Sequence, residues 1–204
     1  TLHLNTVAHV EMLGGIRLEA DTLSVRIEAE AVPVEQQWRV AVKLADSATG
    51  RLFYRGDVWM SESPLVAPPF QRPDFSAAKP YSMNAERAYQ TRIFHGPCFQ
   101  RISRLDGCSE AGLAITLRNS ASERCTDDVD ELGWTINPFL LDVAPQMTLF
   151  WDREQRNRSN LPARFDWFQP YAPLEQARYV YFVRDARSTD QLVRGDYYFV
   201  DAAE

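Results

Sequence analysis

The chain has 204 residues, of which 45% are hydrophobic and 12% aromatic, enough to bury a core as one domain or as two small fused ones. A formal net charge of −6, with basic residues scattered among acidic neighbours, excludes the extended basic surface of a nucleic-acid-binding protein. No apolar run approaches the roughly 18–20 residues of a membrane span, so we expect neither a nucleic acid nor a membrane as a partner.

Cysteine and histidine usage indicates neither a metal site nor a disulfide framework. Cys98, Cys108 and Cys125 are odd in number and lack C-x-x-C spacing, and the three histidines are never paired at ligand spacing. We therefore expect no metal, no disulfide framework and a reducing cytoplasm as the compartment. Because Thr1 begins the chain without a methionine or signal-peptide features, we expect a processed piece of a longer protein.

Residues 1–62 carry the apolar–polar alternation that is typical of strands. The period of two is clearest over residues 23–30 and 38–44, and a third run over residues 52–60 follows a turn at residues 46–50. We expect an antiparallel meander with one solvated face.

Residues 63–80 contain five prolines, a composition that sustains neither a helix nor a strand ladder and predicts an extended linker. A short helix is expected from about Asn84, as the cap, to Ile93, ending before Gly96-Pro97. A strand is expected over residues 113–117, followed by a polar, acidic loop over residues 120–130.

The principal helix is predicted to run from about Pro138 or Asp142 to Gln155. Apolar residues lie nearly all round its first half, which predicts a buried helix. Pro145 is tolerated only in a first turn, so the helix is expected to begin with Asp142 as its N-cap or one residue away. With further strands at residues 179–184 and 197–200, the pattern predicts an α+β fold with a sheet wrapped on one long helix.

Asp142 is the strongest candidate for chemistry, because it sets one carboxylic acid into the apolar run 137–146. Its apolar neighbours favour the protonated carboxyl, whereas a helix N-terminus favours the ionised one, and the sequence does not decide between them. Gln146 lies four residues on, on the same helix face, where it would orient the carboxyl. An aspartate at a helix start is also commonly only a cap.

Three motifs together resemble a known family. These are G-P-x-F-Q at residues 96–100, P-x-L-L-D-x-x-x-Q at residues 138–146 and Leu161-Pro162. The spacing resembles the second half of the dehydratase domains of modular polyketide synthases and bacterial polyunsaturated fatty acid synthases. Those domains are double hot-dog folds, in which two sheet-wrapped helices are fused in one chain.

The resemblance implies a division of the chain. Residues 81–204 would form the second hot dog almost end to end, residues 63–80 the linker, and residues 1–62 the strands of a first hot dog that is incomplete. Such domains act on acyl chains held on the phosphopantetheine of an acyl carrier protein, so we expect that carrier and other synthase domains as partners, and no further cofactor. Hot-dog sheets often pair at their edges, which makes a homodimer the default expectation.

The resemblance also implies a site for removing water from a 3-hydroxyacyl thioester, which requires a base for the α-proton and an acid for the departing hydroxyl. Asp142 would be the acid and Gln146 its orienting partner. N–H groups at the helix start or after Gly96 would stabilise the enolate. The residues expected to bind substrate are Phe94, His95, Gly96, Pro97, Phe99 and Trp151.

Two further clusters have a functional and a structural interpretation. Trp151, with Phe165, Trp167, Phe168 and Tyr171, would line an acyl tunnel or would simply be core. Arginines near the end of the principal helix would receive the acidic carrier protein or its phosphate, or would be a solvated face. These arginines are Arg153, Arg156, Arg158 and Arg164.

The chain departs from the family pattern in several places. The family's base comes from an H-x-x-x-G-x-x-x-x-P motif, which is absent: Gly14 lies five residues after His9 rather than four. His95 stands where polyketide dehydratases usually have tyrosine, Asn137 where they have histidine, and Pro145 lies inside the D-x-x-x-Q. The His-Gly-Pro variant favours the polyunsaturated fatty acid or glycolipid synthase branch.

Three functions follow as hypotheses. The first is dehydration by Asp142 with a histidine from a segment that this chain lacks. The second is a non-catalytic module, a pseudo-dehydratase that holds the acyl chain or supports the architecture, which the missing motif favours. The third is thioester hydrolysis, in which the lone carboxylate and the glutamine activate water.

Overall fold

The computed structural model describes residues 1–17, 21–118 and 134–203, which form two compact units. The first unit comprises Thr1–Pro68 and Pro162–Tyr171, and the second comprises Pro69–Leu161 and Ala172–Glu204. Each unit is described by itself. Within the described residues, no helix has the length and apolar character needed to cross a membrane.

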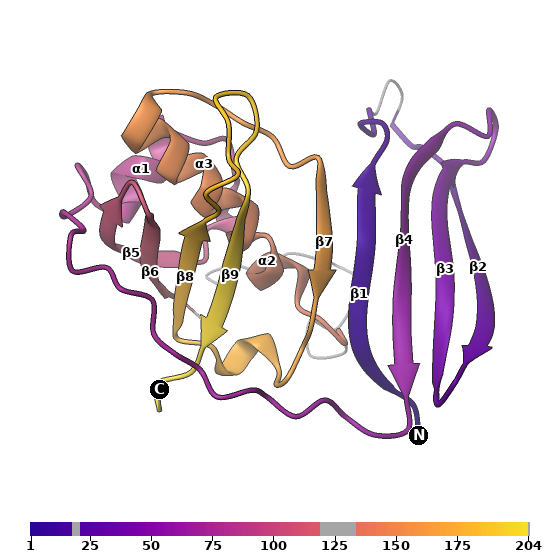
Figure 1. Cartoon of the computed structure of the whole chain (residues 1–204). Helices are drawn as coiled ribbons and strands as arrows, with labels where there is room; N and C mark the ends of the chain where they lie inside the picture. Colours follow the sequence, from indigo (N-terminus) through magenta and orange to yellow (C-terminus); the bar gives the residue numbers. More distant parts are fainter. Residues whose placement is uncertain (18–20, 119–133, 204) are drawn as a thin grey trace. The chain divides into compact units, whose positions relative to one another are not determined.

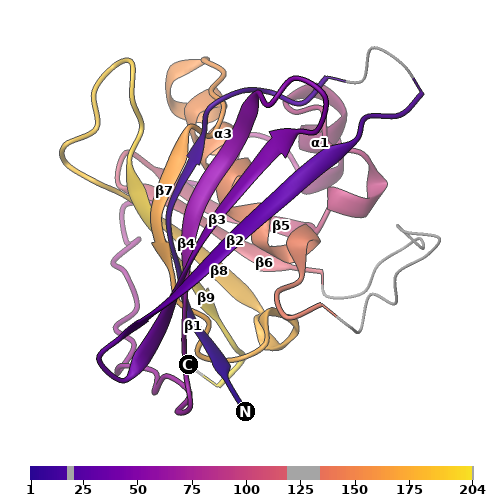
Figure 2. The ribbon, with the colours of Figure 1, turned by 90° about the vertical axis from the view of Figure 1, so that its right-hand side faces the viewer.

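The first unit is a five-stranded antiparallel sheet in the order β2-β3-β4-β1-β7 (Figure 2). Its strands are β1 (His3–Met12), β2 (Val25–Val34), β3 (Gln37–Asp46), β4 (Leu52–Ser61) and β7 (Arg164–Phe168). The predicted strands over residues 23–30, 38–44 and 52–60 are confirmed as β2, β3 and β4, each shifted by a few residues. Val34, the last residue of β2, lies opposite Gln37, the first residue of β3, across a two-residue turn in which Glu35 takes a positive φ of 55°.

Strand β1 lies within the residues 1–62 that were predicted to form strands, but its bounds were not predicted, because two register shifts interrupt its alternation. They fall between Leu4 and Thr6 and between Ala8 and Glu11, and His9 lies in the second with a φ of 51°. Each bulge moves the following side chains to the opposite face, so a period of two is lost in the sequence although the strand pairs on both sides. Apolar residues still lie opposite one another on three neighbouring strands, because Val7 of β1 pairs with both Val58 of β4 and Phe168 of β7.

The second unit wraps a four-stranded antiparallel sheet, in the order β5-β6-β8-β9, on the helix α3 (Figure 1). The strands are β5 (Ile102–Ser109), β6 (Gly112–Leu117), β8 (Tyr179–Arg184) and β9 (Gly195–Val200). The helices are α1 (Ala85–Thr91), α2 (Pro138–Leu141) and α3 (Val143–Arg156), with short 3-10 turns at Pro97–Phe99 and Leu174–Gln176. Both this sheet on one long helix and the sheet of the first unit agree with the predicted α+β architecture, an incomplete double hot dog.

The core of the second unit lies between α3 and the sheet. Val143, Met147 and Phe150 of α3 are fully buried, as are Leu113 and Phe182 on the facing strands. Full burial of a large apolar side chain stabilises the folded state by roughly 1.5–3 kcal/mol relative to leaving the side chain exposed. The prediction of a buried helix is therefore confirmed for most of α3, although Ala144 and Pro145 in its first turn are half-buried.

The principal helix differs from the prediction at its beginning. Instead of one helix there are two, α2 and α3, joined at Asp142, which has helical dihedral angles (φ −64°, ψ −13°) and no capping hydrogen bond from its side chain. Asp142 stands at the N-cap position of α3, as predicted, but the side chain that caps is that of Asn137 at the start of α2, whose oxygen accepts from the N–H groups of Phe139 and Leu140. The carboxyl of Asp142 is consequently not used as a cap. The predicted place of Pro145 in a first turn is confirmed, in α3.

The proline-rich residues 69–80 belong to the second unit and pack against its sheet instead of forming a free linker. Phe70 and Phe75 both stack on Tyr181 of β8, with ring centroids 6.0 Å apart in each pair. Lys79 and Cys108 then exchange two backbone hydrogen bonds of 2.9 and 2.8 Å. The predicted loop over residues 120–130 lies outside the described residues.

Gly112, at the start of β6, is a position that only glycine can occupy. Its φ is +153°, and a Cβ there would lie 1.9 Å from the carbonyl oxygen of Phe182. We expect Gly112→Ala to lower the free energy of unfolding by about 3 kcal/mol or more, because backbone atoms must move. Gly96→Ala is the matched control, since a Cβ at Gly96 meets nothing within 4 Å and should change stability by less than about 0.5 kcal/mol. Equal denaturation midpoints for the two variants would contradict this interpretation.

Candidate functional site

Asp142 lies at the junction of α2 and α3 with two polar partners on one of its carboxylate oxygens. Gln146 Nε2 donates to Oδ2 over 2.8 Å, and His95 Nε2 lies 3.3 Å from the same oxygen. The Asp142 side chain is 30% exposed, so the group is open to solvent on one side. Within the described residues, no hydrogen bond to Asp142 Oδ1 is present.

Gln146 is the buried hydrogen-bond donor to the carboxyl of Asp142. Its side chain is 0% exposed, and besides Asp142 its Nε2 donates to the carbonyl oxygen of Phe99 over 2.9 Å. Its Oε1 accepts from the hydroxyl of Tyr89 over 2.8 Å. The predicted contact between Gln146 and Asp142 is therefore present, and it extends to two further segments of the chain.

His95 approaches Asp142 from the Gly96-Pro97 segment. Its ring stacks on Phe94, with centroids 4.6 Å apart, and packs edge-on to Phe99. Gln100 donates to the carbonyl oxygen of His95 over 2.9 Å, which closes the turn around the 3-10 helix Pro97–Phe99. The other ring nitrogen, Nδ1, is buried and has no hydrogen-bond partner within the described residues.

This arrangement places a carboxyl group beside an imidazole, two side chains that commonly serve in general acid–base catalysis. His95 Nε2 lies within ion-pair distance of Asp142 Oδ2, and the described residues show no hydrogen bond between the two side chains. Phe99 and Phe139, with centroids 5.0 Å apart, add an apolar wall beside it.

The structure gathers most of the predicted site residues in one place. Asp142, Gln146, His95, Phe94 and Phe99 lie together, connected by Gly96 and Pro97. Their functional roles stay predictions.

Trp151, in contrast, lies in the core of the second unit. It is buried, its indole N–H donates to the carbonyl oxygen of Ser109 over 2.8 Å, and the guanidinium groups of Arg156 and Arg184 lie against its ring. The other aromatics proposed for an acyl tunnel belong to the first unit; they are Phe165, Trp167, Phe168 and Tyr171. Trp151 is thus a packed core residue of the second unit.

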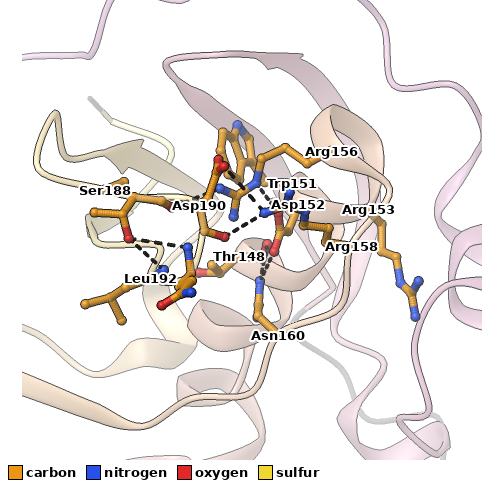
Figure 3. Close-up of polar contacts among 12 residues, drawn as sticks. Thr148, Trp151, Asp152, Arg153, Arg156, Arg158, Asn160, Ser188, Asp190 and Leu192 are labelled. Carbon is orange, nitrogen blue, oxygen red and sulfur yellow. Dashed lines mark hydrogen bonds and ion pairs between the residues drawn. The ribbon is translucent and has the colours of Figure 1, made fainter.

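The arginines at the end of α3 are largely engaged within the unit, as Figure 3 shows. Arg156 pairs with the buried Asp152 and donates to the carbonyl oxygen of Thr189 over 3.1 Å. Arg158 donates to the carbonyl oxygen of Asp190 over 2.7 Å. Arg153 points away from this cluster (Figure 3). Arg156 and Arg158 therefore support the β8–β9 connection, and Arg153, which is partly buried, takes no part in this network.

Two residues of the site were missed in the sequence. Tyr89 gave no signal, because an aromatic residue in a short helix is typical of a core position. Asn137 was noted only as a departure from the family pattern, although an asparagine before Pro138 is typical of an N-cap followed by proline at the first helical position. Within the residues described, no cluster of three or more metal-binding side chains occurs.

Neither of the two cysteines in the described residues is a ready nucleophile for this site. Cys98 is disulfide-bonded, which the cysteine spacing in the sequence did not indicate. Cys108 is a buried thiol on β5, and burial raises its pKa to about 11, although Gln155 Nε2 lies 3.3 Å from its sulfur. A thiol of this kind is mostly protonated at neutral pH.

Comparison with known proteins gives a consistent family assignment. The family model for the polyketide synthase dehydratase N-terminal domain matches residues 62–204. A polyunsaturated fatty acid synthase subunit from Thraustochytrium sp. is 27% identical over 187 residues, which is 84% of this chain. The chain spans only 6% of that relative's length.

Solved dehydratase domains share the fold at low identity. A dehydratase domain of a trans-AT polyketide synthase from Brevibacillus brevis has a TM-score of 0.71 at 16% identity, and covers 98% of this chain and 71% of its own. The dehydratase domain of RzxB from Pseudomonas fluorescens has a TM-score of 0.67 at 19% identity, with 99% and 70% covered. That of PpsC from Mycobacterium tuberculosis has a TM-score of 0.65 at 18% identity, with 97% and 69% covered.

The raised pKa of Cys108 predicts slow reaction with thiol reagents. At pH 8 a shift from 9.0 to about 11 lowers the thiolate fraction about 100-fold, so alkylation of Cys108 in the folded chain should be slower by at least that factor than in denaturant. The same shift should lower stability as the pH rises from 9 to 11, because the thiol then ionises only in the unfolded chain. Peptide mass spectrometry measures the labelling. Rates within tenfold of each other would show that the thiol is accessible.

Proposed function

Because the chain belongs to the polyketide synthase dehydratase family, we propose that it is part of a dehydratase that removes water from a 3-hydroxyacyl thioester on an acyl carrier protein. The observation that carries this proposal is the carboxyl of Asp142, held by Gln146 and His95 and open on its remaining oxygen. In the reaction the α-proton goes to a base and its bonding electrons form the Cα–Cβ double bond. The β-hydroxyl takes a proton from Asp142 and leaves as water.

The geometry supports Asp142 as the acid and argues against His95 as the base. One nitrogen of His95 faces Asp142 and the other is buried, so neither is directed at a substrate carbon. We therefore keep the hypothesis that the base is a histidine supplied by a segment other than these residues. His95 lies beside the carboxyl instead, with Nε2 3.3 Å from Oδ2.

Two other functions make different predictions for the same measurement. A non-catalytic module is favoured by the absence of the H-x-x-x-G-x-x-x-x-P motif, and it would bind an acyl thioester without changing it. Thioester hydrolysis would release a free thiol. Water loss, no change and thiol release are therefore three distinct readouts.

The carrier protein and other domains of a synthase are the partners that this function requires, and an acidic carrier needs a basic surface. Of the four predicted arginines, Arg164 belongs to the first unit, and Arg153 is the one on α3 that points away from the internal network (Figure 3). We assign it to carrier docking, while Arg156 and Arg158 support the β8–β9 connection.

The acid role predicts that Asp142→Asn abolishes most of the activity. With a 3-hydroxyacyl carrier protein as substrate and mass spectrometry for loss of one water, we expect the rate to fall about 100-fold or more, the usual size of an acid–base contribution. Asp106→Asn is the matched control, because its side chain has a similar exposure of 24% and lies in the same unit. Loss of activity in both variants, or in neither, would sink the assignment.

The docking assignment predicts that substitution of Arg153 affects KM, whereas substitution of Arg156 affects stability. Arg153→Ala should raise KM for the acyl carrier protein about fivefold, the effect of roughly 1 kcal/mol from one exposed ion pair, with unchanged stability. Arg156→Ala should lower the unfolding midpoint instead, because it leaves the buried Asp152 without its cation. A KM that does not respond to Arg153→Ala would remove Arg153 from the docking surface.

A further inference from the structure

We propose that the hydroxyl of Tyr89 is a positioning group that fixes the side-chain amide of Gln146 and thereby gives the two oxygens of Asp142 separate roles. The proposal rests on the proposed function, in which Asp142 is the acid. It adds a residue of α1, which does not touch Asp142, to the residues that control the proton.

The hydrogen-bond direction at Tyr89 is determined by its other partner. The backbone N–H of Ile102 donates to the phenol oxygen over 3.1 Å, and a backbone N–H is only able to donate. The phenol hydrogen is therefore directed to Gln146 Oε1, 2.8 Å away. Burial raises the pKa of Tyr89, which keeps the hydroxyl protonated and a donor.

The direction at Tyr89 in turn fixes the amide. With Oε1 facing the hydroxyl, Gln146 Nε2 must face the opposite way, where one hydrogen goes to the carbonyl oxygen of Phe99 and the other to Asp142 Oδ2. A flipped amide would place Oε1 against the carbonyl oxygen of Phe99 and the NH₂ group against the N–H-bonded phenol. Because Gln146 is fully buried, solvent does not relieve either mismatch.

The orientation of the Gln146 amide then determines which oxygen of Asp142 carries the acid's proton. Asp142 Oδ2 accepts from Gln146 and faces His95 Nε2 at 3.3 Å, so a proton on this oxygen would displace a donor. The proton is held on Oδ1, on which the described residues place no hydrogen bond. If the amide turned over, its Oε1 would accept a hydrogen bond from a protonated Oδ2, and the acid's proton would point into the protein instead of toward the substrate.

The test is Tyr89→Phe in a protein that carries this chain together with the segment that supplies the base, measured by water loss from a 3-hydroxyacyl carrier protein. We expect kcat to fall about tenfold with KM unchanged, the effect of about one lost neutral hydrogen bond on the acid rather than on binding. Tyr81→Phe is the matched control. Tyr81 is 7% exposed against 6% for Tyr89, and its ring also packs edge-on to Phe150. Among the described residues its hydroxyl bonds only to the Phe150 carbonyl oxygen. An equal fall in both variants, or none in Tyr89→Phe, overturns the proposal.

A second measurement tests the orientation of the Gln146 amide without an activity assay. The side-chain ¹H–¹⁵N signals of Gln146, assigned by their loss in Gln146→Leu, should move and exchange faster with solvent in Tyr89→Phe and stay in place in Tyr81→Phe. Unmoved signals in Tyr89→Phe overturn the proposal even if kcat falls. If wild-type protein removes no water, the proposed function and the role of Tyr89 in it both fail, while the signals still show whether Tyr89 fixes the amide.

Discussion

A single buried amide, that of Gln146, is the constraint on which the site depends. An amide side chain without solvent must satisfy both its oxygen and its two hydrogens within the protein, because each unpaired polar group in a core costs about 1–3 kcal/mol. Here those partners come from α1, from the segment after Gly96-Pro97 and from the start of α3. The requirement therefore ties three separate parts of the chain to one position, and Asp142 is held as a result.

The helix start is arranged so that this carboxyl remains free for chemistry. Asn137 satisfies the first N–H groups of α2, so Asp142 is not consumed as a cap. Pro145, which needs no partner for a missing N–H, allows α3 to begin directly after Asp142. Two residues that depart from the usual family pattern thus produce a break between α2 and α3 at the acid itself.

The sequence predicted the fold and the contact between Asp142 and Gln146, because both rest on local periodicity. Spacing of four on a helix places two side chains together whatever the rest of the chain does. It did not predict the bounds of β1, whose bulges hide the alternation, or the role of Tyr89, which depends on a contact 57 residues away. The same holds for Trp151, Arg156 and Arg158, whose partners come from residues distant in the chain. Nothing in a linear pattern specifies such pairings.

Strand β2 has a consequence for how this protein behaves in solution. It forms one edge of its sheet, all ten of its residues are exposed, and one of its backbone sides has no strand partner within the described chain. An edge of this kind is a template for strand addition and hence for aggregation. Arg26, Glu28 and Glu30 place charges along it, and Pro33 removes one donor, which are the features that discourage a second strand from adding. Solubility of the sheet is therefore expected to depend on these few side chains rather than on its core.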